Sequence, residues 1–96
     1  MKKAQIKETK IREREIEAEE ATYRYTITMT ESRRVASYRI PLYSIGIEMT
    51  TADGNHTEAL ARDVFADLGK AVVFFDKIVE AKATPLNLYY IVEDGI

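Results

Sequence analysis

An alternating run of side chains near residue 22 constrains the fold of this chain more than any other feature. From residue 22 to residue 30, large apolar side chains take every second position, and threonine or arginine takes the positions between them. The apolar members are Tyr23, Tyr25, Ile27 and Met29. A period of two, built from aromatic, β-branched and threonine residues, is typical of a strand with one face on a core. We therefore predict a strand over residues 22–30, followed by a polar turn at residues 31–34.

A second extended run follows from residue 35 to residue 51. Its apolar residues change parity at Leu42 and Tyr43, and one extra residue in a β-bulge there would return both sets to the same face. Pro41 has no amide donor, which places this stretch at a sheet edge or outside the ladder. The pattern predicts a second strand with a bulge beside Pro41.

The dipeptide Asp53-Gly54 marks the next turn, because both residues accept the positive φ angles of a tight hairpin. Residues 57–63 have helical propensity, but a hairpin turn directly before them requires a returning strand. We expect a short third strand here, with a helix as the alternative.

Two helices are predicted in the last third of the chain. Apolar residues from Leu68 to Val79 fall within one arc at about 100° per residue, and Asp67 stands before them as an N-cap. Thr84 and Pro85 then begin a second helix, because threonine caps a helix and proline is accepted at its first position. This second helix is expected to continue to about residue 94.

The first twenty residues differ in composition from the rest. Most are charged, and every lysine and arginine among them lies before residue 15. The isoleucines Ile6, Ile11 and Ile16 recur every five residues, a spacing that forms no stripe on a helix. We expect residues 1–20 to be a charged arm, helical or disordered. The predicted architecture is α+β, with residues 21–96 as a single domain: a three-stranded antiparallel meander followed by two C-terminal helices packed on one face.

Several short segments in the second half resemble a small bacterial family, a domain of unknown function. They are Tyr43-Ser44-Ile45-Gly46-Ile47-Glu48, Asp63-Val64, Pro85-Leu86-Asn87-Leu88 and Val92-Glu93-Asp94. The resemblance covers about half of the chain and implies a short strand around Asp63. It implies no catalytic or binding residue.

Composition excludes several kinds of chemistry. The chain has no cysteine, so disulfides, thiolate metal sites and cysteine nucleophiles are ruled out. The single histidine, His56, has Asp53 and Glu58 nearby in sequence, which is enough for a weak metal site, but a solvated turn histidine is the preferred interpretation. We expect no metal and no cofactor.

Charge and hydropathy bear on location and on partners. The first residues carry charge where a signal peptide needs an apolar segment, and the longest apolar run is far below the roughly 20 residues of a membrane span. A cytoplasmic protein without membrane association is expected. The formal net charge of -2 argues against nucleic acid as a partner.

The carboxylates Asp63, Glu93 and Asp94 are candidates for an anionic site. Glu93 and Asp94 are adjacent, so on a helix they point about 100° apart and do not converge by themselves. A small hydrolase or isomerase would need such a site to be completed at a subunit interface. This enzyme is the alternative interpretation of the chain.

The second helix is apolar on nearly every side, whereas a surface helix of a monomer should show a polar face. A domain of this size has too little mass to bury such a helix all round, although tyrosines that lie flat on the sheet would also explain the pattern. We predict an interface through Leu88, Tyr89, Tyr90 and Ile91, most simply in a homodimer. The favoured function is a non-catalytic protein-interaction or regulatory module that self-associates through the second helix and a sheet edge.

Overall fold

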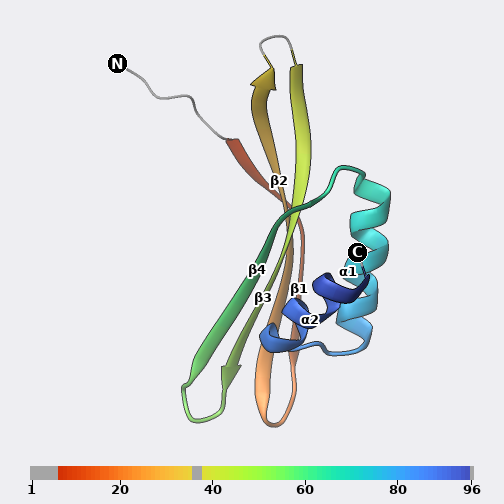
Figure 1. The fold of residues 1–96 in the computed structure, drawn as a ribbon. Helices are drawn as coiled ribbons and strands as arrows, with labels where there is room; N and C mark the ends of the chain where they lie inside the picture. Colours follow the sequence, from red (N-terminus) through yellow and green to blue (C-terminus); the bar gives the residue numbers. More distant parts are fainter. Residues whose placement is uncertain (1–6, 36–37, 96) are drawn as a thin grey trace.

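Four antiparallel strands and two helices make up the protein in a computed structural model. The structure describes the backbone of residues 7–35 and 38–95 and the side chains of residues 8–31 and 41–91. The elements are β1 (Lys7–Glu17), β2 (Ala21–Val35), β3 (Tyr38–Thr51), β4 (His56–Phe65), α1 (Leu68–Glu80) and α2 (Pro85–Gly95). The sheet has the order β1-β2-β3-β4, a meander with both helices on one face (Figure 1). The α+β class is confirmed, and the sheet has four strands where three were predicted.

The additional strand is β1, which pairs with β2 from Lys7 opposite Glu31 to Glu17 opposite Thr22. The prediction of a helical or disordered arm is therefore wrong for residues 7–17. A register shift between Lys10 and Arg12 inserts one extra residue into β1. Because a bulge of this kind changes the face that each later residue takes, the sequence from Ile11 to Ile16 shows no strand period.

The long hairpin of β2 and β3 departs from prediction in two places. β2 continues through residues 31–34, which were predicted as a turn. The β2–β3 register is continuous across Leu42 and Tyr43, so the predicted bulge is wrong, and Leu42 lies half-buried on the other face of the sheet. β4 pairs with β3 only as far as Tyr43. Pro41 thus lies beyond the end of the β3–β4 ladder, as expected for a residue without an amide donor.

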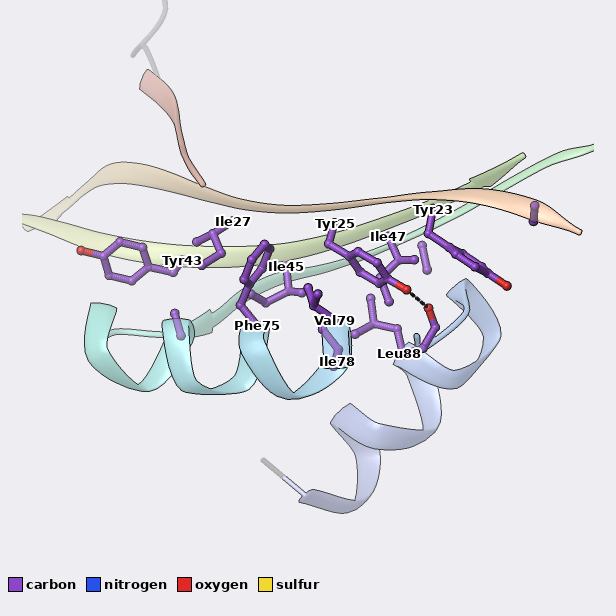
Figure 2. Close-up of a cluster of buried hydrophobic side chains, with 14 residues drawn as sticks. Tyr23, Tyr25, Ile27, Tyr43, Ile45, Ile47, Phe75, Ile78, Val79 and Leu88 are labelled. Atoms are coloured by element: carbon purple, nitrogen blue, oxygen red, sulfur yellow. Dashed lines mark hydrogen bonds between the residues drawn. The ribbon is translucent and has the colours of Figure 1, made fainter. Parts of the chain in front are cut away.

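The core lies between the sheet and the helices. β2 and β3 contribute their odd-numbered residues, including Tyr25, Ile27, Ile45 and Ile47, which are fully buried (Figure 2). The helices contribute Ala71, Phe75, Ile78, Val79 and Leu88. A strand over residues 57–63 is confirmed within β4, whose Ala59 is also buried. α1 packs mainly on β2 and β3, and α2 packs mainly on β4.

Both helices begin where the sequence predicts. The side chain of Asp67 accepts a hydrogen bond of 2.9 Å from the Gly69 amide at the start of α1. At the start of α2, the Asn87 amide donates to the Thr84 hydroxyl over 3.2 Å, and the Thr84 amide donates to the Asn87 side-chain oxygen over 3.1 Å. These bonds satisfy amides that a helix start leaves without partners.

Candidate functional site

The outer side of α2 carries a stripe of exposed apolar residues. Leu86, Tyr89 and Tyr90 are 63%, 56% and 59% exposed. Residues at positions i, i+3 and i+4 of a helix lie on the same side, so the three side chains form one surface. We call these three residues the α2 stripe.

The predicted interface residues do not all reach this surface. Leu88 is fully buried in the core, where it packs between the helices and the sheet (Figure 2). Its placement in an interface is therefore corrected, because no part of its side chain is accessible to another molecule. Ile91 is half-buried against the core. Tyr89 and Tyr90 remain accessible, and Leu86, which sequence reasoning left out, joins them.

The edge strand β4 lies next to the α2 stripe. Leu60 in β4 is 45% exposed. A hollow of about 550 Å³, lined for the most part by residues of β1, β2 and β3 such as Lys10, Arg24 and Glu48, extends to Glu58, Ala59 and Leu60 of β4 and to Tyr89 of α2. On its outer side β4 has no neighbouring strand in the described part of the chain (Figure 1). An apolar helix surface and an open strand edge are therefore contiguous.

Asp63, one of the three predicted anionic residues, lies at an irregularity in β4. The register changes from Ile45 opposite Ala61 to Tyr43 opposite Phe65, so β4 contains extra residues here. Asp63 has a φ angle of 53°, a region that aspartate adopts more readily than most residues. Its amide donates a 2.9 Å hydrogen bond to the hydroxyl of the buried residue Ser44. The backbone of Asp63 thus stabilises the bulge through its hydrogen bond to Ser44.

The other two predicted anionic residues, Glu93 and Asp94, lie on the last turns of α2. Their side chains are outside the described residues. The anionic site that the sequence predicts at Asp63, Glu93 and Asp94 therefore stays a prediction.

The open face of the sheet carries a row of charges that sequence reasoning missed. Arg24 of β2 lies between two glutamates: its Nε is 3.2 Å from Glu13 of β1, and one of its terminal nitrogens is 3.7 Å from Glu48 of β3. Lys10 also binds Glu13, and this bond is the main cause that lowers the pKa of the Glu13 carboxyl. The strand register brings these charged residues together. The sequence did not indicate this row because β1 had not been predicted as a strand.

His56 belongs to the same face and lies near two carboxylates. The ligand atoms of Glu48, His56 and Glu58 all lie within 4.8 Å of one another. Thr50 Oγ1 is 3.0 Å from His56 Nδ1, and His56 Nε2 is 3.7 Å from a Glu58 oxygen. One imidazole nitrogen and two carboxylates are donors that zinc accepts. All three side chains face solvent at least in part, and Glu48 also lies 3.7 Å from Arg24.

Asp53, which the sequence placed beside His56, serves the β3–β4 turn. Its carboxylate accepts a hydrogen bond from the Thr51 hydroxyl, and the Asn55 amide also points toward it. These bonds hold the pKa of the Asp53 carboxyl below its usual value, the Thr51 hydroxyl having the larger effect. Glu48, from the neighbouring strand, takes the place predicted for Asp53.

No helix in the described part of the chain is long and apolar enough to cross a membrane.

Comparison with known proteins identifies a family. Searches of curated proteins and of solved structures found no match. A family model described as "Family of unknown function (DUF6514)" matches residues 4–96, which include all six elements and the surfaces described above. The chain therefore belongs to this family of unknown function.

Proposed function

We propose that this chain is a non-catalytic protein-interaction module that associates with a second copy of itself through the α2 stripe. The observation that carries the proposal is the exposure of Leu86, Tyr89 and Tyr90 on one side of one helix. Burial of apolar surface stabilises a complex by about 25 cal/mol per Å² before the costs of association are subtracted. Tyrosine supplies much of this area with little loss of side-chain entropy.

The position of the stripe supports this proposal. It faces away from the core that Leu88 completes, so a partner can cover it without any unfolding of the chain. Tyr89 also lines the hollow beside β4. A tyrosine with an accessible ring and a hydroxyl able to reach water is a residue type enriched in interfaces.

The test is the mass of the protein in solution. Sedimentation equilibrium at micromolar concentrations should give twice the mass of the chain. Tyr89→Lys should weaken the association about tenfold or more, because a charge then replaces an apolar anchor in the contact.

The matched control is Val73→Lys. Val73 is 57% exposed, close to the value for Tyr89, but lies on α1. The control should associate as strongly as the unmodified chain. A mass of one chain at every concentration, or equal losses in both variants, would refute the proposal.

A further inference from the structure

The two edges of the sheet differ in their readiness to accept another strand. β1 is charged at most positions and contains the bulge at Ile11, two features that protect sheet edges against pairing. In β4, residues 57–61 include one charged residue, Glu58, and pair with β3 without a register shift. β4 has its own bulge around Asp63, so the stretch that is less protected than β1 is residues 57–61.

The backbone of β4 presents hydrogen-bonding groups to this edge. At the turn, the Thr51 amide donates to the Asn55 carbonyl over 2.8 Å, so these two residues form a hydrogen-bonded pair. Hydrogen-bonded and non-hydrogen-bonded pairs alternate along an antiparallel ladder. The N–H and C=O groups of Glu58 and Leu60 therefore point away from β3, toward the free edge, and Arg62 follows directly after this regular part of the ladder.

The side chains of these residues are complementary to a second copy. If β4 pairs antiparallel with another β4 around a two-fold axis at Leu60, Leu60 faces its counterpart, and Glu58 faces Arg62 of the other chain twice. Opposite charges at facing positions stabilise a strand pair, and like charges destabilise it. Arg62 forms no ion pair with the residues that the structure describes. Its charge is therefore available to a partner.

We infer that two copies of the chain join through their β4 edges into one continuous sheet, in the register that pairs Leu60 with Leu60. This inference rests on the proposed self-association and adds a second contact surface beside the α2 stripe. A two-fold axis normal to the sheet keeps all helices on one face. Because α2 packs mainly on β4, the two α2 stripes then flank the new strand pair.

Charge reversal tests the register. Glu58→Arg and Arg62→Glu should each weaken association roughly tenfold, because each change places like charges opposite one another at two symmetric positions. The double variant should associate as the unmodified chain does, since it restores both pairs with reversed polarity. An equimolar mixture of the two single variants should form a mixed dimer of the original strength.

Matched charge reversals away from β4 provide the control. Glu80→Arg and Lys70→Glu change exposed residues of α1 by the same charge and should leave association unchanged. Circular dichroism on every variant would verify that the fold is retained.

A cross-link tests proximity. The chain has no cysteine, so Leu60→Cys introduces a single thiol. The register places the two Cα atoms about 5.5 Å apart, within the range that a disulfide spans. Mild oxidation of Leu60→Cys should produce a covalent dimer. Val73→Cys, oxidised for the same time, should produce almost no covalent dimer.

The outcomes separate the two proposals. An unmodified chain that is monomeric overturns both. A dimer that Tyr89→Lys weakens, but that the β4 substitutions and the cysteine at position 60 leave unaffected, overturns the β4 pairing and retains self-association through α2.

Discussion

The hydroxyl of Tyr25 donates a 2.9 Å hydrogen bond to the carbonyl oxygen of Ala83, 58 residues later in the chain (Figure 2). Tyr25 is fully buried in β2, and Ala83 is buried in the link between α1 and α2. The bond joins the sheet to the point from which α2 departs. It therefore helps to set the position of the α2 stripe beside β4.

Removal of this hydroxyl should destabilise the fold. Tyr25→Phe leaves the buried Ala83 carbonyl without its partner and should reduce the free energy of unfolding by about 1 kcal/mol. Urea denaturation measures the loss. Tyr23→Phe is the control, because the Tyr23 ring is also buried but its hydroxyl has no hydrogen-bond partner among the described residues. Equal losses in the two variants would contradict the assigned role of the bond.

The same hydroxyl should make stability sensitive to alkaline pH. Burial, with a smaller contribution from Tyr23, raises the pKa of the Tyr25 phenol from 10.0 to about 12. Below pH 10 the phenol is protonated in the folded and unfolded chains, and its contribution is fully present. As the pH rises further, the unfolded chain loses this proton first, so the free energy of unfolding falls until the folded phenol also ionises.

The unfolding free energy of the unmodified chain should therefore fall relative to that of Tyr25→Phe above pH 10, and this relative fall should level off near pH 12. Denaturation curves of both proteins across this range would measure it, and changes common to both, such as lysine deprotonation, cancel. A difference that stays constant across the range would contradict a raised pKa.

Local sequence was sufficient for the elements that carry their own signals. Alternation in β2, the Asp53-Gly54 turn before β4, and the caps at Asp67 and Thr84 each depend on residues close in the chain. β1 has no such signal. It is an edge strand, so few of its side chains need to be apolar, and its bulge breaks the alternation that would have revealed it.

The sequence indicated which helix carries the candidate site, but it did not show which side chains of that helix are exposed. An excess of apolar residues on α2 was visible in the sequence, but the side that faces the sheet depends on how the helix is placed. That placement buries Leu88 and exposes Leu86. The charges around Arg24 and the bond between Ser44 and Asp63 depend on strand register, which single-sequence patterns do not determine.

The division of α2 into a buried and an exposed side predicts different effects of truncation. Leu88→Ala should lower the free energy of unfolding by about 2–5 kcal/mol, because it removes a fully buried side chain and leaves a cavity. Tyr90→Ala should lower it by about 0.5 kcal/mol or less at concentrations where the protein is monomeric. Denaturation of both variants at low concentration makes the comparison. A large loss for Tyr90→Ala under those conditions would assign that ring to the core of a single chain.

The bulge in β4 gives a prediction about local stability. Ser44→Ala removes the acceptor of the Asp63 amide, so this amide should exchange with solvent faster and the free energy of unfolding should fall by about 1 kcal/mol. Hydrogen exchange followed by NMR measures the first effect residue by residue. Thr28→Ala is the control, because Thr28 faces Ser44 across the β2–β3 ladder but forms no side-chain hydrogen bond with the described residues.

Because the bulge follows directly after Arg62, Ser44→Ala should also weaken self-association if the β4 edge forms the contact. Unchanged exchange at Asp63 would show that the amide has another acceptor, and the Ser44 bond would then have no part in holding the edge.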